Sequence, residues 1–243
     1  MRLWALSLLV MMPLMVKAEA DPVRLAVASN FKLPLQQLVA AYQAEHGGQF
    51  SISSASTGVL YQQIRRGAPF DIFFAADTQR PALLLQQGYA RDTRHYAQGQ
   101  LALYSAQRPI AEVLNVLPGD CRLAYANPKF APYGIAAQNI LADMPRLQAC
   151  KAIIAANVSQ AFQFTALKNT DVGLVAYSLV LAQKTPKTAY QLLPRQQALV
   201  QSLALLGEQP NPAAEQFIQF LTTPIAKQIL RQTGYEQVDD YAQ

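Results

Sequence analysis

The feature that most limits the possible folds is the alternation of short apolar runs with amphipathic segments along the chain. The run at 24–28 has the length and composition of a buried strand. The next segment places Leu35, Leu38 and Tyr42 at helical spacing and stops at a pair of glycines. Such alternation is typical of α/β folds with largely parallel sheets. The length of 243 residues fits one large domain or two small ones.

The same pattern predicts the remaining elements. Strands are expected at 24–28, 50–55, 71–75, 101–104, 122–126, 152–156 and 172–177, and the run at 203–206 is a candidate for a strand that returns to the first domain. Helices are expected at 59–66, near Ile140, near Phe164, near Val180, and in two C-terminal segments on either side of Thr223 and Pro224.

Small polar residues follow four of the predicted strands, at the point where a helix begins. These four turns are Ser29-Asn30, Ser56-Thr57-Gly58, Pro132-Tyr133-Gly134 and Asn157-Val158-Ser159. Helix N-termini carry unpaired N–H groups and the positive end of the helix dipole, so several of them meeting in one cleft would hold an anion without basic side chains. The pattern favours an oxyanion receptor. Taken singly, Ser29, Asn30, Ser56 and Thr57 are more typical of helix capping or turns, Pro132-Tyr133-Gly134 is also typical of a plain turn, and Val158 is typical of a core residue.

The N-terminus predicts export. Arg2 supplies a positive charge, residues 3–16 are apolar, and Ala18-Glu19-Ala20 has the small-x-small form of a signal-peptidase site. We therefore expect residues 1–20 to be a signal peptide that is cleaved after Ala20, and we expect the protein to be exported. The alternative is a membrane anchor, for which the apolar stretch is short.

The two cysteines, Cys121 and Cys150, form an even pair in a chain with an export signal, so we expect a disulfide. The alternative is a pair of buried free thiols. A metal site is not expected, because neither His46 nor His95 has ligand spacing to a cysteine.

Charge and catalytic motifs narrow the function classes. The formal net charge is +5, and the basic residues are scattered rather than gathered in a run with aromatics, so nucleic-acid binding is not expected. Asp71 and Asp77 are better explained as a strand start and a helix cap than as paired catalytic carboxylates. Ser159 lies in no Gly-x-Ser-x-Gly motif, and no ordered triad appears. We therefore expect no enzyme activity, with a secreted hydrolase as the less favoured alternative.

Five spaced segments resemble the periplasmic molybdate-binding proteins of ABC transporters, in the same order as in that family. They are ASN at 28–30, STGVLYQQI at 56–64, GAPFDIFFAAD at 67–77, ANP with APYG within 126–134, and NVSQ at 157–160. Together they extend over nearly the whole chain after residue 20. Any one of them alone would be weak, but their agreement in order is specific.

The resemblance implies a type II periplasmic binding protein, in which two α/β domains with mostly parallel sheets are joined by two crossing segments. The crossings would lie near Gly99 and within 190–201. The first domain would comprise residues 21–99 and 201–243, and the second domain residues 100–200. The ligand would lie in the cleft between the two domains.

The resemblance also implies the ligand and its donors. Molybdate or tungstate would be bound without a counter-ion or cofactor by Ser29, Asn30, Thr57, Tyr133 and Val158, the last two through their main-chain N–H groups. The chain departs from many members of the family in having Ala176 where they have a tyrosine; Asn30 therefore takes the fifth place, with Tyr177 as the alternative. The implied partners are a membrane permease and its ATPase, and the implied state is a monomer. The alternative ligand is another small oxyanion or an organic acid.

Overall fold

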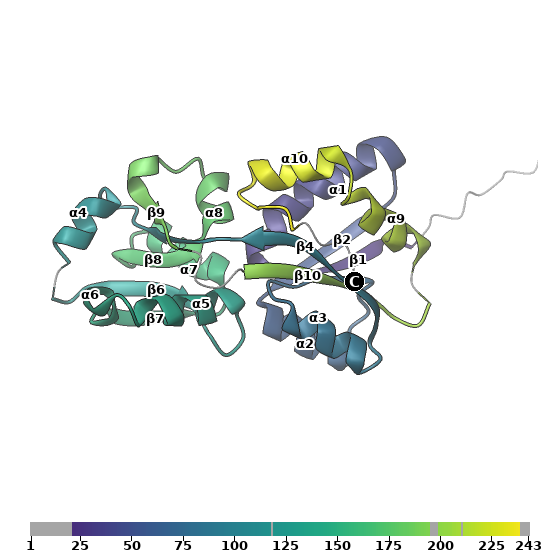
Figure 1. The fold of residues 1–243 in the computed structure, drawn as a ribbon, viewed down its shortest axis with the longest axis horizontal. Coiled ribbons are helices and arrows are strands. Elements are labelled where there is room, and N and C mark those ends of the chain that lie inside the picture. The colour runs from purple at the N-terminus through teal and green to yellow at the C-terminus, as the bar shows by residue number, and fades with distance from the viewer. Residues whose placement is uncertain (1–20, 118, 195–198, 210, 239–243) are drawn as a thin grey trace, which may run out of the picture.

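The computed structural model describes residues 21–117, 119–194, 199–209 and 211–238, so the expected signal peptide lies outside the described residues. The chain forms two lobes placed end to end, each built on a five-stranded sheet with helices on its faces (Figure 1). We call the lobe that contains the first strand the first lobe, and the other the second lobe.

The sheet of the first lobe has the strand order β2-β1-β3-β10-β4. Its strands are β1 (Val23–Ala28), β2 (Phe50–Ala55), β3 (Ile72–Phe74), β4 (Ala90–Gly99) and β10 (Leu199–Leu206). Strands β2 and β3 pair with β1 in parallel, whereas β10 is antiparallel to both β3 and β4.

The second sheet repeats this arrangement with the order β7-β6-β8-β5-β9. Its strands are β5 (Leu101–Tyr104), β6 (Arg122–Ala126), β7 (Lys151–Ala155), β8 (Val172–Ala176) and β9 (Tyr190–Leu192). Strands β7 and β8 pair with β6 in parallel, and β5 is antiparallel to β8 and β9. Both sheets are thus mixed, because β10 in the first and β5 in the second run against the other four strands.

Helices cover both faces of the sheets. In the first lobe, α1, α9 and α10 lie on one face and α2 and α3 on the other (Figure 1). The helices are η1 (Ser29–Phe31), α1 (Lys32–His46), α2 (Thr57–Arg65), α3 (Gln79–Gln86), α4 (Ile110–Asn115), α5 (Pro132–Leu141), α6 (Pro145–Gln148), α7 (Val158–Ala166), α8 (Tyr177–Ala182), η2 (Lys187–Ala189), α9 (Pro212–Phe220) and α10 (Pro224–Gln232).

Alternation along β1 explains why the sheet needs two helical layers. Val23, Leu25 and Val27 contribute to the core under α1 and α9, whereas Ala26 on the opposite face packs with Leu60 of α2. Because successive side chains of a strand point to opposite faces, a strand such as β1, which is buried at every position except Arg24, must be covered on both sides. The run at 24–28 therefore belongs to a buried strand, as the sequence predicts.

The chain crosses between the lobes twice. It leaves the first sheet at Gly99 and enters the second at Leu101, and it returns between β9 and β10. Strand β4 was not expected from the sequence, because Arg91, Asp92, Arg94 and His95 interrupt any apolar pattern there. The helix expected near Ile140 lies earlier, so that Ile140 is in the last turn of α5. The division into domains by residue number stays a prediction.

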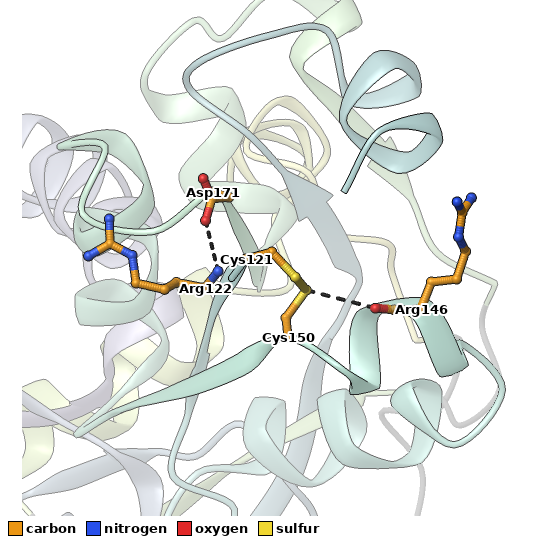
Figure 2. The surroundings of a disulfide bond; sticks show 5 residues. All are labelled: Cys121, Arg122, Arg146, Cys150 and Asp171. Atoms are coloured by element: carbon orange, nitrogen blue, oxygen red, sulfur yellow. Dashed lines mark hydrogen bonds between the residues drawn. A yellow bond between two sulfur atoms is a disulfide. The ribbon is translucent and has the colours of Figure 1, made fainter. Parts of the chain in front are cut away.

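A disulfide between Cys121 and Cys150 confirms the expected pairing, with the two Cα atoms 4.9 Å apart. The two cysteines immediately precede β6 and β7, and the amide of Lys151 donates to the carbonyl oxygen of Cys121 over 2.8 Å. Figure 2 shows the bond beside Arg122, whose amide donates to the Asp171 carboxylate over 2.7 Å. The disulfide thus joins the amino ends of two adjacent parallel strands.

Candidate anion site between the lobes

The carboxyl ends of the parallel strands in the two lobes face each other. Ala28, the last residue of β1, and Ala76, just after β3, pack in the same buried cluster as Tyr133 and Val158 of the second lobe. Strands that run in parallel end at one edge of a sheet, and ligands of open α/β sheets bind outside that edge. The four polar turns that the sequence singles out all lie at these edges.

Two hydroxyl groups of the second lobe donate to the turn that contains Ser29. Ser159 Oγ lies 2.9 Å from the carbonyl oxygen of Ser29, and Ser178 Oγ lies 3.0 Å from the carbonyl oxygen of Asn30. Both acceptors belong to η1 of the first lobe, and both donors lie in the first turns of α7 and α8. These bonds hold the lobes together in a closed arrangement.

A third bond across the lobes involves the N-terminus of α2. The amide of Gly58 donates to the carbonyl oxygen of Phe130 over 2.8 Å. Beside it, Thr57 is 1% exposed, and its Oγ1 accepts a hydrogen bond from the amide of Ala76 over 3.1 Å. Since that bond uses an oxygen lone pair, the hydroxyl proton of Thr57 remains available for an anion. Ser56 Oγ is also buried and has no hydrogen-bond partner among the described residues.

The helices of the second lobe supply main-chain donors. Asn157 caps α7 by accepting a hydrogen bond from the Gln160 amide over 3.0 Å, and Val158 is the first residue of the helix. Tyr133 follows Pro132 at the start of α5. The first N–H groups of a helix have no acceptor within the helix, so those of Val158 and Tyr133 can serve a ligand. Val158 and Tyr133 are 3% and 2% exposed.

The hydroxyl of Tyr133 is directed away from this role. It lies 3.5 Å from Nε2 of Gln201, and a β-carbon built on Gly99 would come within 2.2 Å of it. Gly99 therefore leaves room for the Tyr133 side chain at the crossing. We therefore take the main-chain N–H of Tyr133, at the start of α5, as its candidate donor.

The side chain of Asn30 is already engaged within the protein. Its Nδ2 donates to Gln201 Oε1 and to the hydroxyl of Tyr235, each over 2.9 Å. The two amide protons are thus both used, which leaves the main-chain N–H of Asn30 as its remaining donor. The alternative residue, Tyr177, packs against Tyr190 with a ring separation of 5.8 Å, and its amide donates to the Gln100 carbonyl over 2.9 Å.

A neutralised ion pair lies at the rim of the site. Arg80 pairs with Asp77, whose Oδ1 also accepts a hydrogen bond from the Arg80 amide over 3.0 Å. A β-carbon built on Gly58 would lie 3.3 Å from Nη2 of Arg80, so the guanidinium stands beside the N-terminus of α2. The pair lines a cavity of about 490 Å³ that also contacts Pro132 and Ile135 of the second lobe.

Burial raises the pKa of three tyrosines below the site. The pKa of Tyr235 rises to about 12, and those of Tyr96 and Tyr133 rise well above the ordinary value, in each case chiefly because the ring is buried. All three hydroxyls are therefore neutral at physiological pH. Among the described residues, no three His, Cys, Asp or Glu side chains lie close enough together to bind a metal ion.

Comparison with known proteins identifies the family. Residues 23–236 match the model of the bacterial extracellular solute-binding proteins. The chain belongs to this family. The fold class and the family expected from the sequence are thereby confirmed, and the family is one of binding proteins rather than enzymes. In the described residues, no helix is both long and apolar enough to span a bilayer.

Two curated relatives of this solute-binding protein are named molybdate-binding protein ModA. The one from Rhodobacter capsulatus is 33% identical and the alignment covers 97% of this chain and 96% of the relative. The one from Azotobacter vinelandii is 34% identical, and the alignment covers 90% of this chain and 91% of the relative. A solved structure, the Azotobacter vinelandii periplasmic molybdate-binding protein, has a TM-score of 0.81 at 32% identity and covers 89% of this chain and 100% of that chain.

Proposed function

We propose that this solute-binding protein captures molybdate, and also tungstate, between its two lobes. The observation that carries the proposal is the meeting of four helix N-terminal segments, two from each lobe, through the bonds Ser159 to Ser29 and Gly58 to Phe130. Buried N–H and hydroxyl donors then converge from both sides. The named relatives, at about one-third identity over nearly the whole chain, support molybdate as the anion.

The proposed donors are the hydroxyl groups of Ser29 and Thr57 and the main-chain N–H groups of Asn30, Tyr133 and Val158. None of them carries a charge. An oxyanion that has no proton at neutral pH satisfies such a ring, whereas hydrogen phosphate would place its own proton against a donor. Sulfate has the same charge but is smaller, so its oxygens would fall short of donors placed for molybdate. The ring thus selects by protonation state and by size.

The bonds between the lobes, such as those of Ser159, Ser178 and Gly58, suggest how binding is linked to delivery. An anion that completes donors from both lobes favours the closed arrangement over an open one. The closed form would then deliver its anion to a membrane permease driven by an ATPase. We further propose that the protein acts as a monomer in the periplasm, after cleavage of the signal peptide following Ala20.

Isothermal titration of the purified protein with molybdate, tungstate, sulfate and phosphate tests the proposal. We expect a dissociation constant of about 1 μM or below for molybdate and tungstate. Sulfate and phosphate should bind at least about 100-fold more weakly. Sulfate is too small to reach all the donors, and the proton of hydrogen phosphate would face a donor N–H or O–H group. Tight binding of sulfate, phosphate or an organic acid with no binding of molybdate would contradict the proposal.

A further inference from the structure

The hydroxyl of Tyr235 lies at a junction between the lobes. It is 2.9 Å from the carbonyl oxygen of Asn30 in the first lobe and 3.1 Å from Ser178 Oγ in the second. Ser178 Oγ is in turn 3.0 Å from the same Asn30 carbonyl, so the three oxygens form a closed triangle. Tyr235 is 2% exposed, and the triangle is therefore shielded from water.

The C-terminal segment places this hydroxyl by contacts with both lobes. Glu236 pairs with Gln98 of β4 through two main-chain hydrogen bonds of 2.9 and 3.0 Å. The ring of Tyr235 packs edge-on against Phe31 of η1, with ring centroids 5.1 Å apart. Gly234 has φ of 85°, and a β-carbon there would come within 3.0 Å of Tyr177 and Leu181 in α8. A glycine is thus needed where this segment passes the second lobe.

Asn30 connects the triangle to a second set of buried polar groups. Its Nδ2 donates both to Tyr235 and to Gln201, and Gln201 Oε1 also accepts from the hydroxyl of Tyr96 over 2.9 Å. Gln201 lies next to an irregularity in the β10–β4 pairing, between Gln201 and Ser202. Asn30 is consequently fixed by hydrogen bonds to both its main-chain carbonyl group and its side-chain amide.

A buried tyrosine hydroxyl is costly unless it is hydrogen-bonded, whereas phenylalanine fills nearly the same volume without a polar group. The chain nevertheless places the hydroxyl of Tyr235 against the turn that carries Ser29 and Asn30. From this geometry we propose that Tyr235 is a positioning residue of the anion site: it fixes the Ser29–Asn30 turn and joins it to Ser178 in the closed form. This inference rests on the proposed function.

The test compares Tyr235→Phe with Tyr42→Phe. Tyr42 is also a buried tyrosine of the first lobe, but its hydroxyl has a long bond of 3.4 Å to Gln216 within that lobe. We expect Tyr235→Phe to raise the dissociation constant for molybdate about fivefold to tenfold, mainly through faster release. Tyr42→Phe should leave it within about twofold. Thermal melting of the ligand-free variants reports any general loss of stability.

Ser178→Ala and the double variant show whether Tyr235 acts across the lobes. If both residues serve one triangle, the double variant should bind molybdate less weakly than the product of the two single effects predicts. If the wild-type protein binds molybdate and Tyr235→Phe binds it with the same affinity, this inference is overturned and the proposed function stays intact. Equal losses in Tyr235→Phe and Tyr42→Phe would also overturn it. A wild-type protein that binds neither molybdate nor tungstate would overturn both.

Discussion

The amide nitrogen of Gly58 lies 2.8 Å from the carbonyl oxygen of Phe130, and this hydrogen bond joins the N-terminus of α2 to the second lobe. The approach is possible because residue 58 has no side chain. A β-carbon there would be 2.9 Å from the Phe130 oxygen and 3.0 Å from its Cα. Gly58 is thus a point where closure depends on the smallest residue.

Gly58→Ala should therefore weaken anion binding by at least about 1–2 kcal/mol, because the added methyl group meets main-chain atoms that cannot turn aside. The ligand-free protein should melt at nearly the wild-type temperature, since the clash arises between the lobes. Gly119→Ala is the matched control, because a β-carbon at Gly119 meets nothing within 4 Å. Titration with molybdate and thermal melting measure both effects; equal affinity in the two variants would show that the lobes need not meet at Gly58.

Thr57→Ala should weaken molybdate binding by roughly 1–3 kcal/mol, because one anion oxygen loses its hydroxyl donor. The Ala76 amide also loses its acceptor in this variant. Thr57→Ser keeps the hydroxyl and should bind within about threefold of the wild type. Calorimetric titration of the two variants side by side separates the hydroxyl from the methyl group, and a normal affinity in Thr57→Ala would remove Thr57 from the donor set.

The Arg80–Asp77 pair should affect anion affinity only when its two charges no longer cancel. Arg80→Gln leaves the Asp77 carboxylate without its partner near an anion site and should weaken binding by roughly 1–2 kcal/mol at low salt. Combining it with Asp77→Asn should restore most of the affinity, because both charges are then gone. If the double variant binds as weakly as Arg80→Gln, the guanidinium contacts the anion directly. Titrations at two salt concentrations distinguish these results.

Replacement of Cys121 and Cys150 together by serine should lower the free energy of unfolding by about 3–4 kcal/mol, since the bond closes a loop of 29 residues in the unfolded chain. Anion affinity should stay within about twofold, because the disulfide lies at the amino ends of β6 and β7 and the proposed site at their carboxyl ends. Urea unfolding with and without a reducing agent measures the first effect. A large loss of affinity would show that the second lobe is reshaped without the bond.

Alkaline pH should destabilise the protein through its buried tyrosines. The pKa of Tyr235 is about 12 in the folded protein, against about 10 in an unfolded chain, so the folded state retains a proton that the unfolded state loses. Stability is complete below pH 10 and falls by roughly 2–3 kcal/mol for this group as the pH rises to 12. Tyr96 and Tyr133 act in the same direction. Urea unfolding between pH 9 and 12, compared with Tyr235→Phe, checks the sign and the size.

Much of the fold can be predicted from the sequence, because buried strands such as β8, and β1 apart from Arg24, are apolar and because glycines and capping residues mark the helix ends. The disulfide is predictable for a different reason, namely an even cysteine count with an export signal. Strand β4 escapes prediction because most of its residues are polar and because it is stabilised by pairing with β10, where even Gly99 and its partner Leu199 are 100 positions apart. No local pattern carries that information.

The candidate site divides in the same way. The four polar turns stand out in the sequence, and the structure brings them to facing edges. The sequence predicts Asn30 only as a ligand residue. It gives no sign of the hydrogen bonds from its side chain to Gln201 and Tyr235, because these partners are distant in the chain. Tyr235, Ser178 and Gln201 carried no signal at all, because a single tyrosine, serine or glutamine in an ordinary segment is unremarkable until the chain folds.

The long pairing of β4 with β10, from Gly99 and Leu199 to Ala90 and Leu206, has a mechanical consequence. A ribbon of two hydrogen-bonded strands resists sliding of one strand past the other, but it bends and twists readily. We therefore expect the two lobes to separate by a hinge motion, with the hinge at the end of this ribbon near Gly99 and Leu199. Release of the solute would then require bending at this hinge, rather than sliding of one lobe along the other.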